Sequence, residues 1–232
     1  MSYPPLGSFG PRAIAWWALR TQVDSLRVLG AEHVPAAGPT MIVARHYHHL
    51  LDGSVIVARV SRPVHIVVGL DWARNARERR IMEWACRAAD WPIVLRRATF
   101  DAPAADRPSA YAPRELFRYT RRAIREATRL LRAGRVVAIF PEAFPTIDPA
   151  ATPRRAPGQR PSFERGFATM LAQAEADGHT RIAVVPLGFS YQPTGAKWSI
   201  TARFGPAMTS RAASDVEAVI ASLSRNSEAP AV

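Results

Sequence analysis

Two kinds of hydrophobic pattern alternate along the chain. Short runs in which nearly every residue is apolar have the length of strands buried on both faces, and longer stretches with apolar residues every third or fourth position are typical of helices. The strand-like runs are 40–44, 64–68, 92–95, 136–140, 182–187 and 198–204. The helix-like stretches are 8–28, 52–59, 73–88, 115–132, 163–176 and 213–223. This alternation predicts an α/β fold in which helices flank a central, mainly parallel, mixed sheet.

The first helix-like stretch, 8–28, mixes apolar and basic residues. Its apolar side is formed by Phe9, Ile14, Trp16, Trp17, Leu19 and Val23, and its polar residues include Arg12, Arg20 and Arg27. Such a helix either covers the core or lies at the headgroup boundary of a membrane. We therefore predict an N-terminal amphipathic helical segment over residues 1–30, one main domain over 31–224 and a polar tail over 225–232.

Two segments interrupt the regular pattern. Residues 100–113 are rich in alanine, proline and aspartate without a period, and we predict a surface loop there. Residues 141–161 contain many prolines and are too long for an ordinary connection in a compact domain. We interpret the second segment, including the loop at 143–161, as a lid or a disordered region.

The charge of the chain predicts an anionic partner. Its 232 residues include 31 basic and 19 acidic side chains, which gives a net charge of +12, and Lys197 is the only lysine. Nucleic acid, anionic lipid headgroups and phosphorylated small molecules would all be attracted. The arginines are spread among apolar segments and do not alternate with aromatic residues along one stripe, which argues against nucleic acid.

Cysteine content and hydropathy narrow the protein class further. Cys86 is the only cysteine, so an intrachain disulfide and a cysteine metal cluster are excluded. The N-terminus lacks the pattern of a secretory signal, and no run reaches the roughly 18 apolar residues that span a bilayer. We expect a protein that is either free in solution or lies on a membrane surface.

Polar side chains follow two of the buried strands. His46 and His48 come directly after 40–44, and Glu142 follows 136–140. In α/β sheets ligands bind beyond the carboxyl ends of the strands. A histidine with a carboxylate on the next helical turn, such as Asp52, can deprotonate a hydroxyl. His46 is the first candidate for this base, and His48 is the alternative because it lies four positions before Asp52.

A metal site is the competing interpretation of the histidines. His46-x-His48 is similar to the opening of a binuclear metallohydrolase motif, His-x-His-x-Asp-His. However, Leu50 and Leu51 occupy the positions of the required aspartate and histidine. The remaining histidines lie in contexts that offer no obvious further ligands. We predict no metal, and a metallohydrolase remains an alternative.

Six segments resemble, in order, the glycerolipid acyltransferase family (1-acylglycerol-3-phosphate acyltransferase-like) over nearly the whole chain. The family has a strand that ends in Asn-His, followed by four residues and Asp, and later the motif Phe-Pro-Glu-Gly. The matching segments here are RVLGAEHVPAAGPTMIVARH at 27–46, PIVLRR at 92–97, Phe-Pro-Glu at 140–142, the stretch 163–174, VVPL at 184–187 and FGP at 204–206.

The resemblance implies that residues 31–224 form an acyltransferase domain, and it also implies which reaction this domain catalyses. A fatty acyl group would move from acyl-CoA or acyl-ACP, as co-substrate, to a hydroxyl of a lysophospholipid such as lysophosphatidate, with no metal or redox cofactor. The protein would work in phospholipid biosynthesis, as a peripheral protein on an anionic membrane surface at the cytoplasmic face, without a nucleic-acid partner.

The resemblance also implies roles for individual residues. His46 would be the general base and Asp52 would orient it. Arg96 or Arg97 would hold the phosphate of the acceptor, since arginine suits phosphate through its bidentate fork. Pro141 and Glu142 would contact the polar head of the acceptor.

The spacing between the histidine and the aspartate departs from the family. Five residues separate His46 from Asp52, so counting back four from Asp52 selects Tyr47. A tyrosine is a poor base at neutral pH because its ordinary pKa is about 10. We predict that the extra residue is accommodated in the strand-to-helix turn and that His46 remains the base.

The segment after Glu142 departs as well. Ala143 replaces the family's glycine, and Phe144 and Pro145 stand where many members have threonine and arginine. Either arginines of the long loop (Arg154, Arg155 and Arg160) supply the missing charge, or the acceptor is not a lysophospholipid. Two further alternatives therefore stay open: the same fold acylating another acceptor, such as a glycan or a lipid precursor, and a catalytically idle lipid- or nucleic-acid-binding module.

Overall fold

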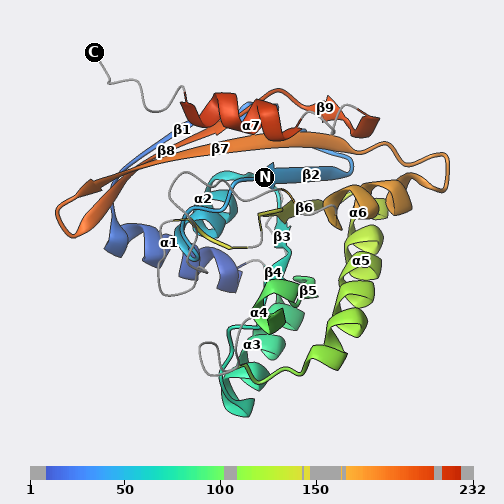
Figure 1. Ribbon diagram of the computed structural model, residues 1–232. Coiled ribbons are helices and arrows are strands. Elements are labelled where there is room, and N and C mark those ends of the chain that lie inside the picture. Colours follow the sequence, from blue (N-terminus) through green and yellow to red (C-terminus); the bar gives the residue numbers. More distant parts are fainter. Residues whose placement is uncertain are drawn as a thin grey trace.

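The structure is a computed structural model that describes residues 9–101, 109–142, 144–146, 163, 166–211 and 216–225. Its helices are α1 (Phe9–Gln22), η2 (Ala31–His33), α2 (Leu51–Arg59), α3 (Ala76–Ala88), α4 (Arg97–Asp101), η3 (Pro113–Glu115), α5 (Leu116–Arg132), α6 (Gly166–Glu175) and α7 (Val216–Arg225). Its strands are β1 (Val23–Leu29), β2 (Thr40–Ala44), β3 (Val64–Ile66), β4 (Val68–Gly69), β5 (Ile93–Val94), β6 (Val136–Ile139), β7 (Ala183–Thr194), β8 (Lys197–Phe204) and β9 (Met208–Thr209). The predicted α/β class is confirmed (Figure 1).

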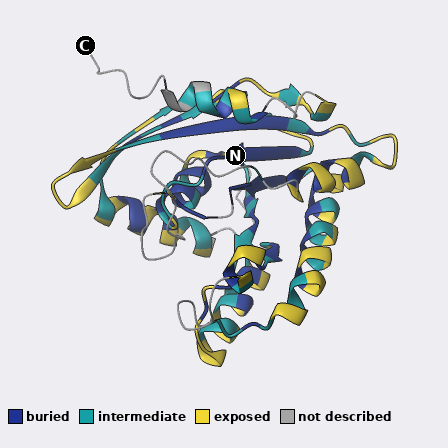
Figure 2. Ribbon diagram, in the orientation of Figure 1, coloured by how far each residue is buried: buried dark blue, intermediate teal, exposed yellow. Residues whose placement is uncertain are grey.

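The main sheet is mostly parallel, as expected. Its strand order is β1-β8-β7-β2-β6-β3, and β9 pairs with β7. β2 runs parallel to both of its neighbours, β6 and β7, whereas β7 and β8 form an antiparallel hairpin. All five residues of β2 are buried, as its colour in Figure 2 shows. A continuous apolar run is what a strand needs when both faces of the sheet are covered.

Alternate residues of β2 face two different cores. Ile42 and Ala44 belong to the core that includes side chains of α1 and α2. Met41 and Val43 belong to the core that includes side chains of α5, α6 and α7. In Figure 1, α7 lies on one face of the sheet and α1 and α2 lie on the other. The carboxyl end of β2 therefore emerges between two packed helical layers.

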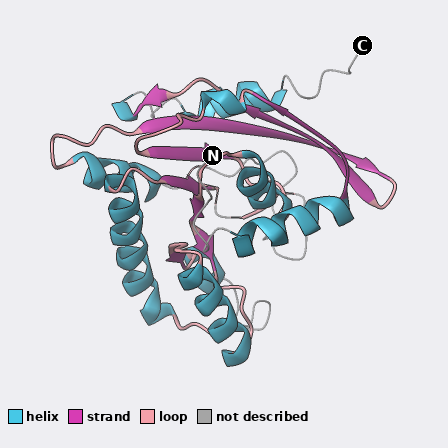
Figure 3. Ribbon diagram, turned by 180° about the vertical axis from the view of Figure 1, so that it is seen from behind, coloured by secondary structure: helices cyan, strands magenta, loops and turns pink. Residues whose placement is uncertain are grey.

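A lobe built from β4, β5, α3, α4 and the start of α5 projects from the sheet next to β3 (Figures 1 and 3). The single strand predicted at 64–68 is in fact two, β3 and β4. The amide of Val67 still bonds to the carbonyl of Ala138 in β6 (2.9 Å), but the amide of Val68 bonds to that of Pro92 (2.9 Å). The chain thus leaves the main sheet after Val67 and forms a two-stranded sheet with β5.

The helix predicted at 8–28 is correct only up to Gln22. Residues Val23–Leu29 form β1, which pairs in parallel with β8. An irregularity in the register between Val23 and Ser25 breaks the two-residue alternation of a strand, so the apolar residues did not show a strand pattern. The prediction of a wholly irregular loop at 100–113 is also wrong at its start, since α4 extends to Asp101.

The apolar side predicted for α1 is buried only in part, at Leu19. The buried residues of this helix are Ala15, Ala18 and Leu19. Three of the large apolar side chains are exposed instead: Ile14 (62%), Trp16 (49%) and Trp17 (63%). Within the described part of the chain, no helix combines the length and the hydrophobicity needed to cross a bilayer.

Several predicted features lie outside the described residues. These are Ala143, nearly all of the loop at 143–161 with Arg154, Arg155 and Arg160, and residues 226–232 of the polar tail.

Candidate active site

Two loops meet at the carboxyl edge of the main sheet. One follows β2 and carries His46, and the other follows β6 and carries Glu142. The backbone amide of His46 donates to Oε2 of Glu142 (3.1 Å), and its carbonyl accepts from the amide of Thr146 (2.9 Å). Because β2 and β6 are parallel neighbours, their ends lie side by side, as the sequence led us to expect.

His46 and Asp52 are brought together within hydrogen-bonding distance. Nδ1 of His46 lies 2.9 Å from Oδ2 of Asp52, whose side chain is completely buried. The same oxygen accepts the backbone amides of Tyr47 (2.6 Å) and His48 (3.0 Å). The extra residue is therefore taken up between β2 and α2, and the backbone amide of Tyr47 contacts Asp52.

The imidazole of His46 is held in one orientation. Its ring stacks on Phe140 with 4.5 Å between the ring centres, and only 14% of its side chain is exposed. With Nδ1 directed at Asp52, the tautomer that donates a proton from Nδ1 to the carboxylate leaves the lone pair on Nε2. The arrangement therefore presents Nε2 as a proton acceptor.

His48 lies in a different environment from His46. Its Nδ1 accepts the backbone amides of Leu50 and Leu51, both at 3.3 Å. It therefore satisfies amide groups at the start of α2, which have no partner within the helix. Its hydrogen bond to Asp52 is made by its backbone amide. The geometry thus pairs the imidazole of His46, and not that of His48, with the aspartate.

Glu142 lies in an internal ion pair. Its Oε1 is 3.0 Å from a guanidinium nitrogen of Arg45, and its side chain is 1% exposed. Arg45 also reaches Glu217 of α7 at 3.5 Å. Pro141, next to Glu142, is buried. In this structure Glu142 thus fixes the loop that carries His46 against the loop after β6.

Arg96 and Arg97 point in different directions. The Nε and NH2 groups of Arg96 bond to the buried carboxylate of Asp71 at 2.7 to 2.9 Å. Its guanidinium also lies over the ring of Phe144, at 4.2 Å from the centre. The side chain of Arg97 is 83% exposed and pairs only distantly with Asp101 (3.9 Å). Arg96 is thus the arginine that the fold connects to the loop after β6.

Two residues of this region, Asp71 and Tyr191, were not predicted from the sequence, and Phe144 was noted only as a departure from the family pattern. Asp71 binds Arg96, Phe144 stacks under it, and Tyr191 of β7 donates its hydroxyl proton to Oδ1 of Asp52. Burial, followed by the charge of Asp52, raises the pKa of Tyr191 well above its ordinary value. Asp71 follows the apolar run that begins at Val64, so an acid at a strand end was a usable signal. Tyr191 gave no such signal, because it lies beyond the strand-like run 182–187.

The donor atoms for a metal ion are limited. Among the described residues, no group of three or more histidine, cysteine, aspartate or glutamate side chains is placed so that it could hold a metal. Nδ1 of His46 and Nδ1 of His48 both face partners within the protein.

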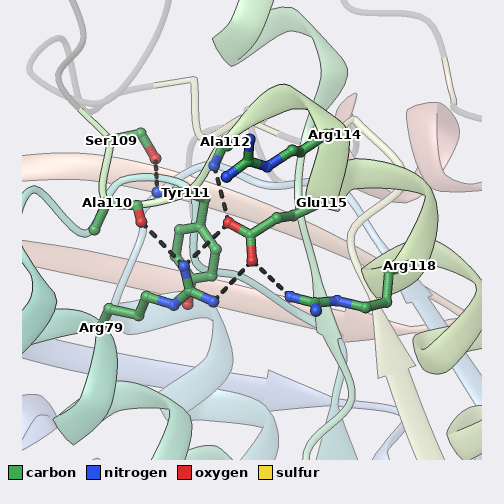
Figure 4. A pocket seen from close by; sticks show the side chains of 8 residues that line it. All are labelled: Arg79, Ser109, Ala110, Tyr111, Ala112, Arg114, Glu115 and Arg118. Carbon is green, nitrogen blue, oxygen red and sulfur yellow. Dashed lines mark hydrogen bonds and ion pairs between the residues drawn. The ribbon is translucent and has the colours of Figure 1, made fainter.

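A cavity of about 760 Å³ lies in the lobe and not at this site. It is lined by Arg79, Ser109, Ala110, Tyr111, Ala112, Arg114, Glu115 and Arg118 (Figure 4). Arg79 and Arg118 both converge on the carboxylate of Glu115, and the hydrogen bond from Arg79 is the main cause of its lowered pKa. Because none of the predicted site residues lines this cavity, we place the candidate active site at the turn between β2 and α2.

Comparisons with known proteins identify the family and the fold. The sequence model of the family described as Acyltransferase matches residues 25–190. No curated protein matches the chain. The structure is similar to the crystal structure of the 1-acyl-sn-glycerophosphate (LPA) acyltransferase PlsC from Thermotoga maritima, with a TM-score of 0.58 and 16% sequence identity over 96% of this chain and 81% of that chain. At this identity, the likeness shows a shared fold.

Proposed function

Because the chain belongs to the Acyltransferase family, we propose that it is a glycerolipid acyltransferase acting on a lysophospholipid such as lysophosphatidate. The family resemblance drawn from the motifs is confirmed by the match over residues 25–190. The donor in this proposal is acyl-CoA or acyl-ACP, and the proposed chemistry uses no metal or redox cofactor. The observation that carries the proposal is the pair formed by His46 and the buried Asp52, 2.9 Å apart at the carboxyl end of β2.

The proposed reaction is a direct acyl transfer. Nε2 of His46 takes the proton of the acceptor hydroxyl as its oxygen attacks the thioester carbonyl. The new C–O bond forms, the C–S bond breaks, and the departing thiolate receives the proton from His46. Asp52 holds the imidazole in the required tautomer and stabilises the imidazolium that forms between these steps.

We assign the phosphate of the acceptor to Arg96. Asp71 and the ring of Phe144 hold its guanidinium in a fixed place beside the loop after β6. A pre-oriented fork loses less conformational freedom on binding phosphate than a mobile side chain does. Pro141 and Glu142 shape this side of the site, and Glu142 acts by holding the backbone of His46.

We also propose peripheral binding at an anionic membrane surface, on the cytoplasmic face. The exposed Ile14, Trp16 and Trp17 of α1 support it, because tryptophan favours the headgroup boundary. The net charge of +12 would add attraction to anionic lipids. Binding of the purified protein to anionic vesicles, but not when Trp16 and Trp17 are both replaced by serine, would support this part of the proposal.

The test of the proposed reaction is product identification. The purified protein is incubated with acyl-CoA, and separately with acyl-ACP, in a mixture of lysophosphatidate, other lysophospholipids and glycan acceptors, and the products are identified by mass spectrometry. We expect phosphatidate-type products. If no acyl thioester and no lysolipid gives a product, the proposed function fails, and a catalytically idle lipid- or nucleic-acid-binding module becomes the better interpretation.

A second candidate function is acylation of an acceptor that is not a glycerolipid. The observation in its favour is Phe144, which lies under Arg96 where many family members have a polar residue. In the same mixture, an acylated glycan or lipid precursor without acylated lysophosphatidate would select this second candidate.

A further inference from the structure

The hairpin formed by β7 and β8 extends beyond the end of β2. The pairing of β2 with β7 ends at Ala44 and Leu187, but β7 continues to Thr194 with β8 as its partner. Leu187 and Phe189 are fully buried and belong to the core that contains α2. Since successive side chains of a strand point to opposite faces, Tyr191 lies on the same face as these two residues. The extension thus places the hydroxyl of Tyr191 next to Oδ1 of Asp52.

Tyr191 completes the hydrogen bonding of the aspartate. Oδ2 of Asp52 accepts from His46, Tyr47 and His48, and Oδ1 accepts from the hydroxyl of Tyr191. The ring of Tyr191 is held by Trp198 (5.8 Å between ring centres, edge to face) and Phe189 (6.1 Å). The carboxylate is therefore fixed from both sides, with His46 on one oxygen and β7 on the other.

The neighbours of Tyr191 that titrate come from the β2–α2 turn. They are Asp52 itself, Tyr47 (5.9 Å between ring centres) and His48 (6.4 Å). Since the pKa of Tyr191 is raised well above its ordinary value, first by burial and then by the charge of Asp52, its hydroxyl keeps its proton at neutral pH. It remains a donor to Asp52 under the conditions in which His46 would act.

We propose that Tyr191 is a positioning residue, which fixes the Asp52 carboxylate so that Oδ2 orients His46 for proton transfer. The inference rests on the proposed function for its kinetic effect and on the structure alone for its geometry. Without the hydroxyl, Oδ1 has no donor, so the carboxylate keeps its contact with His46 but is fixed less precisely for orienting the imidazole. A carboxylate with one donor fewer also holds the imidazolium more strongly.

Tyr191→Phe tests this role, and Tyr119→Phe is the matched control. Tyr119 is also buried, and its hydroxyl donates to the buried Glu83 at 2.6 Å, in the lobe and away from His46. We expect Tyr191→Phe to lower kcat about 10- to 100-fold with the KM values for both substrates changed less than about twofold. The acidic limb of its pH–rate profile should move to higher pH. Tyr119→Phe should change thermal stability but neither kcat nor the profile.

The kinetic results can overturn the inference. If Tyr191→Phe keeps kcat within about twofold of wild type with an unchanged pH profile, Tyr191 does not position the pair. An equal loss of kcat in Tyr119→Phe would mean that both variants lose activity through general destabilisation. This result would also overturn the inference.

A measurement that needs no activity separates this inference from the proposed function. In the proton NMR spectrum of wild type we expect a low-field resonance from the Nδ1 proton of His46, because that proton is hydrogen bonded to Asp52. His46→Ala assigns the resonance by removing it. Tyr191→Phe should shift or broaden it, and Tyr119→Phe should leave it in place. An unchanged resonance in Tyr191→Phe would contradict the inference even if the protein proved inert with every acyl thioester.

Discussion

Two aspartates in this protein are equally buried but have different partners. Asp52 is 0% exposed and Asp71 is 1% exposed. Asp52 contacts an imidazole, a tyrosine hydroxyl and two backbone amides. Asp71 contacts the guanidinium and the backbone amide of Arg96 and the hydroxyl of Thr99. Since both are almost completely buried, the difference between them lies in their hydrogen-bond partners.

The partners decide what each aspartate can do. Arginine stays protonated at all accessible pH values, so the positive charge beside Asp71 is always present. The partner of Asp52 gains its charge only when His46 takes up a proton, and this gain is what favours proton transfer from a hydroxyl. We therefore interpret Asp52 as part of the chemistry and Asp71 as part of the frame that places Arg96.

The largest effect expected from this comparison is on catalysis by Asp52→Asn. The amide keeps the size of the side chain but loses the charge and favours the wrong tautomer of His46. We expect kcat for thiol release from acyl-CoA to fall by about 10³- to 10⁴-fold. Circular dichroism should show that the variant is folded. A loss of less than about tenfold would mean that Asp52, like Asp71, only supports the structure.

Asp71→Ala should have its main effect on stability. It removes the carboxylate that bonds to the guanidinium of Arg96, a side chain that is only 12% exposed. We expect the free energy of unfolding in urea to fall by about 3–5 kcal/mol. The double variant Asp71→Ala/Arg96→Leu should recover part of this loss, because it also removes the positive charge that Asp71 balances. If the single variant is as stable as wild type, the pair does not hold this part of the fold.

Arg96 and Arg97 offer a matched pair for substrate binding. Arg96→Lys removes the bidentate fork, and we expect the KM for lysophosphatidate to rise about tenfold or more. Arg97→Lys changes a neighbouring side chain that is 83% exposed. The KM of this variant for lysophosphatidate should stay within about twofold of wild type. The opposite result would assign the phosphate to Arg97.

The smallest effect expected concerns pH and Tyr191. Its folded pKa is raised by burial and by Asp52, so above pH 10 the unfolded chain loses this proton before the folded protein does. The stability that it contributes is therefore present below its unfolded pKa and is lost as pH rises toward the folded value. We expect wild type to lose up to about 1.4 kcal/mol more per pH unit above pH 10 than Tyr191→Phe, measured by urea unfolding. Equal slopes would contradict the raised pKa.

Much of the fold could be predicted because the hydrophobic pattern of each segment matched the burial of that segment in the structure. β2 was predicted at its observed bounds, Thr40–Ala44, since a strand buried on both faces is a continuous apolar run. β1 was missed because it pairs with β8, about 175 residues later in the chain, and contains an irregular register. Distance along the chain also decided which site residues could be predicted. His46 and Asp52 are close in sequence and were paired, whereas Tyr191 reaches Asp52 only through the extended hairpin.

The most direct test of the account is thiol release from acyl-CoA in the presence of lysophosphatidate, with His46→Ala and His48→Ala measured beside wild type. We expect His46→Ala to lower kcat by about 10³-fold or more. His48→Ala should keep kcat within a few fold of wild type and lose about 1 kcal/mol of stability, because its imidazole accepts amides at the start of α2. An active His46→Ala, or an inactive but folded His48→Ala, would contradict the assignment of His46 as the base.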